Sequence, residues 1–287
     1  MTNVPNVKLN NGVEMPAEGF GVYRIDGFEN CKQAVKNALS VGYRTIDTAQ
    51  QYHNEDAVGA AIEESEISRN DIFITTKVWI TEFEYAKTRA SIEASLKKLR
   101  TDYIDLVLLH QPFGDSYSAY RALEDLYDEG KIRAIGVSNY NSDRYIDIQH
   151  FARIKPAVDQ METHVFFQQK EMQAYTNKYG TKLESWGPFA NGKHDIFTNP
   201  ILTKIGKQYQ KTASQVALRF LTQKDIIIIP KSNSIERMRQ NIDIWDFTLS
   251  DADMESIENM DTNESSFMNL HDPKTVEWIV NSVPEKK

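Results

Sequence analysis

The feature that most constrains the fold is a regular alternation between short β-branched runs and longer segments of helical periodicity, from about Leu39 to Ile242. Successive runs begin roughly 30 residues apart, the length of one strand–helix unit. We predict buried strands at 43–47, 72–77, 104–110 and 132–137, a continuation at 157–160, 183–186 and 226–229, and a weaker first strand at 19–23. The count is about eight.

The segments between these runs are predicted to be helices that bury one face. Ile92, Leu96 and Leu99 are spaced by four and then three residues, so they share one face of a helix. Hydrophobic strands that alternate with helices indicate a parallel sheet covered on both faces, and about eight units favour closure into a barrel. A chain of 287 residues also has the length of two domains. We predict an α/β fold, a (β/α)8 TIM barrel, as a single domain over residues 1–287.

A β-hairpin precedes the first strand. Residues 7–16 alternate around Asn11 and Gly12, and Asn-Gly is a strong hairpin signal. We expect this hairpin to close the bottom of the barrel. The nearest approach to a dinucleotide-binding Gly-x-Gly-x-x-Gly motif, at 19–21, stops short of it, so the fingerprint of an open dinucleotide-binding sheet is missing.

Charge and composition limit the classes of partner. With 33 basic and 41 acidic residues the net charge is −8, which disfavours indiscriminate nucleic-acid binding because that affinity comes mainly from Lys and Arg. An anionic ligand would need a local basic site.

Cys31 is the single cysteine and is expected to be a small buried hydrophobe. Because no targeting segment or membrane-length apolar run occurs, we expect a cytoplasmic protein with no membrane partner.

Four reactive residues lie at the ends of predicted strands. Asp47, Lys77 and His110 end three successive strands, 30 and 33 residues apart, and Tyr52 lies just beyond the first. In a barrel of this kind the carboxyl ends of the strands carry the catalytic groups. Each residue alone has an ordinary structural explanation, such as a helix cap or a solvated strand end. Their spacing of one unit each predicts that all four face one mouth.

These residues lie in motifs that resemble those of the aldo-keto reductase family. Residues 42–55, GYRTIDTAQQYHNE, resemble the signature that carries the family's catalytic Asp and Tyr. Lys77 follows Ile-Thr-Thr as the family lysine does, and LLHQP at 108–112 matches the segment with its His. Further matches are at 136–140, 159–162 and 229–232, and the resemblance, closest to the bacterial diketogluconate-reductase-like branch, runs from about Val7 to Leu249.

The resemblance implies reduction of an aldehyde or ketone to an alcohol by hydride transfer. Tyr52 would donate the proton, and Lys77 would lower the pKa of that phenol towards the working range. Asp47 would keep Lys77 charged and oriented, while His110 would place the carbonyl oxygen. The partner implied is a small carbonyl compound, and the family resemblance suggests a monomer.

The hydride must come from a cofactor, because no side chain can supply one. By resemblance, Ser138, Asn139 and Gln160 would bind the nicotinamide carboxamide and Trp186 would stack on its ring. Lys231, Ser232 and Arg237 would hold a phosphate monoester near a helix N-terminus, which indicates NADPH/NADP+. The ordinary alternatives are a turn, core packing and a solvated basic helix face. The remaining cofactor contacts implied are Gly21, Val22, Tyr23, Asp47, Gly187, Pro188, Phe189, Asn233, Gln240 and Asn241, the last at the adenine.

The substrate pocket is expected to contain Trp79 and Gln111 beside Tyr52 and His110, with Tyr23, Phe113 and Trp186 as further candidates. Gln111 stands where many relatives have Trp, so one aromatic wall is expected to be lost.

Three other functions deserve comparison. A metal-dependent hydrolase would need clustered ligands, but the six histidines are scattered, so we expect no metal. A Schiff-base aldolase could use Lys77, yet a neighbouring carboxylate would keep its amine charged. The non-enzymatic alternative is a cofactor-binding regulatory subunit with little turnover.

Overall fold

Eight parallel strands form a barrel in the computed structural model, which describes residues 4–281. Each strand pairs with the next along the chain, in the order β3 to β10. The strands are β3 (Phe20–Gly21), β4 (Thr45–Asp47), β5 (Phe73–Val78), β6 (Ile104–Leu109), β7 (Ile132–Ser138), β8 (Val158–Glu162), β9 (Lys182–Trp186) and β10 (Ile227–Ile228). The predicted first strand at 19–23 is shortened to two residues.

The barrel is closed between its first and last strands. Glu18 forms a parallel bridge with Ile228, and the backbone N–H of Gly19 donates to the carbonyl oxygen of Ile228 at 2.8 Å. A Cβ atom on Gly19 would lie 2.7 Å from Cγ2 of Thr45, so this seam requires glycine. The predicted (β/α)8 barrel is confirmed.

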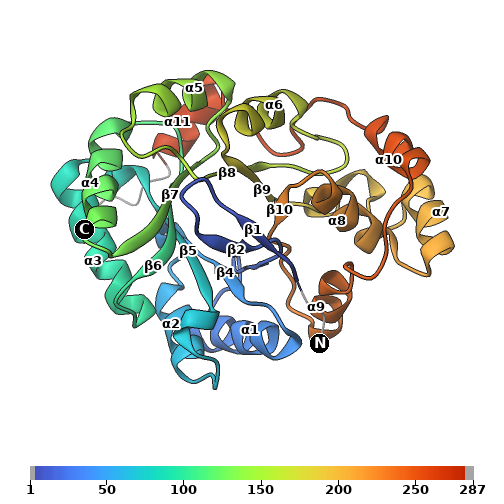
Figure 1. Ribbon diagram of the computed structural model, residues 1–287, viewed down its shortest axis with the longest axis horizontal. Coiled ribbons are helices and arrows are strands. Elements are labelled where there is room, and N and C mark those ends of the chain that lie inside the picture. The colour runs from blue at the N-terminus through green and yellow to red at the C-terminus, as the bar shows by residue number, and fades with distance from the viewer. Residues whose placement is uncertain (1–3, 282–287) are drawn as a thin grey trace.

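Helices surround the barrel (Figure 1). They are α1 (Phe28–Val41), α2 (Glu55–Glu63), α3 (Tyr85–Leu99), α4 (Ser116–Asp128), α5 (Ser142–Phe151), α6 (Lys170–Tyr179), α7 (Pro200–Tyr209), α8 (Ala213–Gln223), α9 (Ile235–Ile242), α10 (Asp251–Glu258) and α11 (Pro273–Asn281). Ile92, Leu96 and Leu99 of α3 are buried, as their spacing predicts. In residues 4–281 no helix combines the length and the apolar character needed to cross a membrane.

The predicted hairpin is confirmed as β1 (Asn6–Lys8) and β2 (Glu14–Pro16), and it closes the amino end of the barrel. Figure 1 shows it lying across the centre of the ring of strands. Leu9 and Met15 join a buried cluster that includes Phe73, the first residue of β5. The side-chain amide of Asn10 donates to the carbonyl oxygen of Pro156, just before β8. The opposite end, where the strands finish, is therefore the mouth.

Glu18 is a buried carboxyl at the seam of the barrel. The hydroxyl of Tyr43 donates to its Oε1 at 3.3 Å, and Nε1 of Trp245 donates to its Oε2 at 3.0 Å. Burial raises the pKa of Glu18 to about 8, and the two hydrogen bonds only partly oppose that rise. The folded protein therefore holds a proton here that an unfolded chain releases above pH 4.5.

We predict that Glu18→Gln flattens the pH dependence of stability. Because the folded pKa of Glu18 is raised, its contribution to stability is complete below the unfolded pKa and is lost as the pH rises from about 4.5 to about 8. Across that pH window the free energy of unfolding of Glu18→Gln should rise relative to that of the wild type by on the order of a few kcal/mol, since one pKa unit is about 1.4 kcal/mol. Urea unfolding at pH 5 and pH 9 measures this, and an unchanged difference at both pH values would contradict it.

Candidate active site

The four reactive residues meet at the mouth of the barrel. Asp47 ends β4, Lys77 lies in β5, His110 follows β6, and Tyr52 ends the short helix η1 (Gln50–Tyr52). Nζ of Lys77 donates to both carboxylate oxygens of Asp47, at 2.7 and 2.8 Å, and to the hydroxyl of Tyr52 at 3.4 Å. The parallel register of β4 and β5 brings Asp47 and Lys77 together, because both side chains stand near the same end of the sheet.

Lys77 is a fully buried cation with a counter-ion. Burial by itself lowers the pKa of its ammonium, but the charge of Asp47 and hydrogen bonding to it raise the pKa more, so the net shift is upward. The carbonyl oxygen of Thr48 accepts a further hydrogen bond at 3.0 Å. Lys77 is therefore charged throughout the physiological pH range.

Tyr52 differs from the sequence-based expectation. Burial raises the pKa of its phenol and Lys77 lowers it, and burial is the larger effect, so the result is about 12. Lys77 lowers this pKa, as expected, but the loss of hydration raises it more, so the net pKa lies above the usual value of a phenol. Tyr52 is a protonated phenol at neutral pH, beside a cation that stabilises the phenolate after proton transfer.

His110 is a neutral imidazole. Burial, and then the charge of Lys77, hold its pKa well below the usual value. Its ring lies edge-on to the rings of Tyr52 and Trp79, with centroids 5.6 and 5.1 Å away. Within residues 4–281, Nδ1 of His110, Nε1 of Trp79 and Oε1 of Gln111 are buried without a hydrogen-bond partner. These unsatisfied polar atoms suit a polar ligand at the mouth.

The residues expected at the nicotinamide form one hydrogen-bonded group. Oγ of Ser138 donates to the carbonyl oxygen of Gln160 at 2.9 Å, and Nδ2 of Asn139 donates to the carbonyl oxygen of His110 at 3.1 Å. Nε1 of Trp186 donates to Oδ1 of Asn139 at 2.9 Å. Side chains from the ends of β7 and β9 are thereby held in fixed positions, in part by backbone carbonyl oxygens at β8 and after β6.

Gln160 joins this group to the reactive residues. Its Nε2 donates to Oδ2 of Asp47 and to Oε2 of Glu184, both at 2.9 Å. The sequence analysis missed Glu184. A signal exists, because Glu184 interrupts a strand and lies two residues before Trp186, on the same face of the sheet.

A second missed residue, Glu162, fixes a segment near the C-terminus. Its carboxylate accepts hydrogen bonds from the backbone N–H of Ser266 at 2.7 Å, from the hydroxyl of Ser265, and from His164 at 3.0 Å. The ring of Phe267 then lies 5.1 Å from that of Trp186. No local pattern in 263–268 predicts this contact.

The other expected cofactor residues occupy two loops beside the mouth. Val22 and Tyr23 follow Gly21 at the end of β3, and the ring of Tyr23 lies 4.9 Å from that of Tyr52. The second loop, Gly187, Pro188 and Phe189, follows β9 and begins with a glycine at φ 64° that lies against Phe267.

The basic residues lie around the start of α9. Lys231 and Arg237 are exposed, and Ser232 is buried. Ser234 caps the helix by accepting a hydrogen bond from the backbone N–H of Arg237. In the part of the chain that the structure describes, no ion pair involves Lys231 or Arg237. Two unpaired cations beside a helix N-terminus fit an anionic group.

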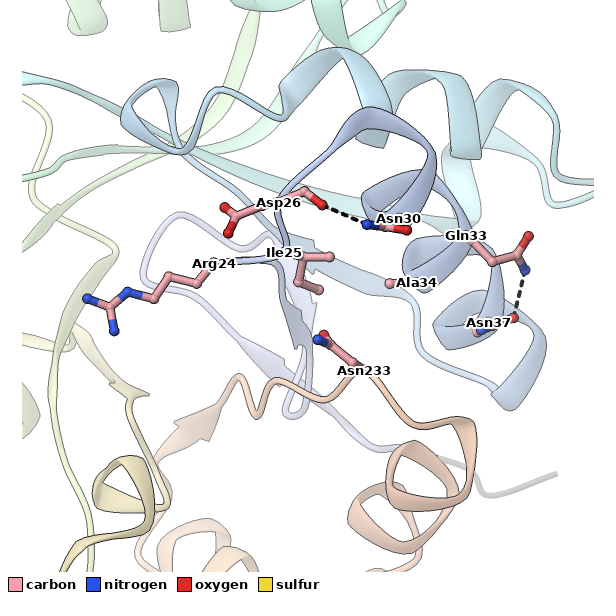
Figure 2. A pocket seen from close by; sticks show the side chains of 8 residues that line it. All are labelled: Arg24, Ile25, Asp26, Asn30, Gln33, Ala34, Asn37 and Asn233. Atoms are coloured by element: carbon pink, nitrogen blue, oxygen red, sulfur yellow. Dashed lines mark hydrogen bonds between the residues drawn. The ribbon is translucent and has the colours of Figure 1, made fainter.

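Asn233 lines a polar hollow of about 530 Å³ next to this helix (Figure 2). Figure 2 shows its side chain opposite the loop of Arg24, Ile25 and Asp26 and the polar face of α1. Gln240 lines a separate hollow with Arg239, and Asn241 is buried. Asn233 and Gln240 thus line two different hollows.

Among residues 4–281, no group of three or more His, Cys, Asp and Glu side chains is arranged to hold a metal ion.

Comparison with known proteins identifies relatives along most of the chain. The model of the aldo/keto reductase family matches residues 19–262. Glyoxal reductase of Bacillus subtilis is 44% identical over 259 residues, covering 90% of this chain and 93% of the relative. Methylglyoxal reductase DkgA of Escherichia coli is 35% identical over 264 residues, covering 91% and 95%.

Solved structures of aldo-keto reductases are also similar to this chain. An aldo-keto reductase from a Medee basin deep-sea metagenome library has a TM-score of 0.89 and 44% identity, covering 93% of this chain and 98% of that one. An aldo-keto reductase of Bombyx mori in complex with NADP has a TM-score of 0.88 and 30% identity, covering 94% and 96%.

We predict that Lys77→Met destabilises the fold at pH 7 by about 3–5 kcal/mol, because it leaves the buried carboxylate of Asp47 without its cation. The double variant Asp47→Asn/Lys77→Met is the control and should unfold at higher urea concentration than Lys77→Met. A double variant less stable than the single one would show that the ion pair is not the cause.

Proposed function

The chain belongs to the aldo/keto reductase family, and we propose on this premise that Tyr52, Lys77, Asp47 and His110 perform its carbonyl reduction. The protein is an NADP(H)-dependent oxidoreductase that reduces aldehydes or ketones to alcohols. The observation that carries the assignment is the buried ammonium of Lys77, placed between the carboxylate of Asp47 and the hydroxyl of Tyr52.

The residues present fit the cofactor. Bound NADPH supplies the hydride. Lys231 and Arg237 lie beside the N-terminus of α9 and suit the 2′-phosphate, and Ser232 lies between them in the sequence. Ser138, Asn139 and Gln160 supply amide and hydroxyl groups for the nicotinamide carboxamide, and Trp186 supplies an aromatic face. A similar protein from Bombyx mori is described in complex with NADP.

Proton transfer to the substrate oxygen follows from the charges at the mouth. Tyr52 holds its proton at neutral pH and donates it from its hydroxyl to the oxygen of the carbonyl group. Lys77 stabilises the phenolate left behind, and Asp47 keeps Lys77 in place. His110, being neutral, donates a hydrogen bond to the same oxygen without competing for the proton.

We further propose that small 2-oxoaldehydes are among the substrates. Relatives at 44% and 35% identity are named glyoxal reductase and methylglyoxal reductase. Nε1 of Trp79 is a buried donor without a partner, and its ring lies against that of His110, so it can donate a hydrogen bond to a second carbonyl oxygen while His110 donates to the first.

Tyr52→Phe is expected to lower kcat for methylglyoxal by roughly 10²–10⁴-fold, the usual contribution of a general acid. The ring of Tyr52 remains in the variant, so NADPH should bind with an unchanged Kd. Oxidation of NADPH followed at 340 nm gives kcat, and quenching of tryptophan fluorescence gives Kd. Turnover at the wild-type rate would remove Tyr52 from the mechanism.

Lys231→Met and Arg237→Met are each expected to raise KM for NADPH about tenfold, since one charge-assisted contact to phosphate is worth roughly 1.4 kcal/mol or more. KM for NADH, which has no 2′-phosphate, should stay within about twofold. Lys207→Met removes the same charge from an exposed position on α7 and serves as the control. Equal losses with both cofactors would reject the phosphate assignment.

A further inference from the structure

Glu184 is a buried carboxyl that the proposed mechanism does not use. It lies in β9, opposite Gln160 of β8 in the register of the sheet, and its exposed fraction is 0%. Its Oε2 accepts the hydrogen bond from Nε2 of Gln160 at 2.9 Å. Its Oε1 has no hydrogen-bond partner among the residues that the structure describes. A carboxyl buried with one free oxygen is costly unless it is neutral or has a role.

Burial and the charge of Asp47 favour the neutral form of Glu184, while Gln160 and Lys77 oppose them more weakly. The charged neighbours are Asp47 from β4 and Lys77 from β5, and Gln160 from β8 is a neutral amide. On the other side, β10 contributes Ile227 and Ile228. Burial, followed by the charge of Asp47, raises the pKa of Glu184 to about 8. Near neutral pH the charges of Lys77 and Asp47 cancel, and ionisation of Glu184 at higher pH leaves one net negative charge.

The two hydrogen bonds of Gln160 also fix which way its amide faces. Nε2 has two hydrogens, and they go to Asp47 and Glu184. A flipped amide would place its carbonyl oxygen against the carboxylate of Asp47, which is repulsive. Oε1 is therefore turned away from both carboxyl groups and is left to accept a hydrogen bond from a ligand.

We propose that Glu184 is a positioning residue that orients Gln160 and, through its own charge, sets the relative binding of the oxidised and the reduced nicotinamide. The inference rests on the proposed role of Gln160 at the nicotinamide carboxamide. The oxidised ring carries a positive charge and the reduced ring does not. An ionised Glu184 adds negative charge one hydrogen bond away from Gln160, so it favours NADP+ over NADPH.

Proton binding by Glu184 and binding of NADP+ are thermodynamically linked, so each must affect the other in the same direction. If ionisation of Glu184 tightens binding of NADP+, then binding of NADP+ lowers the pKa of Glu184 and releases a proton. Binding of NADPH releases none from this group. Both forms carry the same 2′-phosphate, so its own titration cancels when the two are compared.

The test compares the ratio Kd(NADPH)/Kd(NADP+) at pH 6.5 and pH 9.5, with each Kd from quenching of tryptophan fluorescence. In the wild type this ratio should rise roughly fivefold or more, the low end of coupling between two sites. In Glu184→Gln, which cannot ionise, it should stay constant within about twofold. A ratio that is flat in the wild type, or that rises equally in Glu184→Gln, overturns the proposal.

Glu18→Gln is the matched control. Glu18 is also fully buried with a pKa raised to about 8, but its partners are Tyr43 and Trp245 rather than Gln160. The ratio in this variant should rise as in the wild type. An equally flat ratio in Glu18→Gln would show that removing any such buried carboxyl has the effect, and would overturn the proposal.

A second measurement needs no variant. At pH 8 in weak buffer with an indicator dye, wild-type protein should release protons when NADP+ is added and release fewer with NADPH. Equal release with both forms overturns the proposal even if Glu184→Gln fails to fold. If neither nucleotide binds the wild type, the proposed function fails; if both bind without the pH effect, only this inference fails.

Discussion

The mouth of the barrel is organised around one buried charge, the ammonium of Lys77. A cation at 0% exposure is tolerated only when a counter-ion and hydrogen-bond acceptors replace its water. Asp47, the carbonyl oxygen of Thr48 and the hydroxyl of Tyr52 do so. Because β4 and β5 are adjacent and parallel, the side chains of Asp47 and Lys77 meet at the same end of the sheet. The ion pair therefore depends on the order of the strands.

The pKa values of the neighbouring groups follow from this low-dielectric setting. Tyr52 keeps its proton because burial outweighs the charge of Lys77, whereas His110 stays neutral because burial and that same charge both lower its pKa. Gln160 extends the network to Glu184, so the reactive group and the nicotinamide group proposed for the cofactor share one set of hydrogen bonds. A change in the charge of Glu184 therefore alters the electrostatic environment of Asp47 and Lys77.

The sequence predicts the parts of this arrangement that repeat along the chain. The 30-residue spacing places Asp47, Lys77 and His110 at adjacent strand ends, and the structure has them there. Glu162 and Phe267 were missed because their contacts join segments about 100 residues apart in sequence, as between Glu162 and Ser266, without a local pattern. The effect of Lys77 on the pKa of Tyr52 was predicted in the right direction, but the larger effect of burial was not, because a motif indicates which charges are near and not how far water is excluded.

The hydrogen bonds to Glu162 also tie the barrel to a segment outside the range that the family model matches. The family match ends at residue 262, yet the next residues return to β8 and press Phe267 against Trp186. Residues beyond the matched range thus support an aromatic ring inside the proposed cofactor site. A change at Ser265, Ser266 or Phe267 would therefore alter how the ring of Trp186 is held while leaving every strand of the barrel intact.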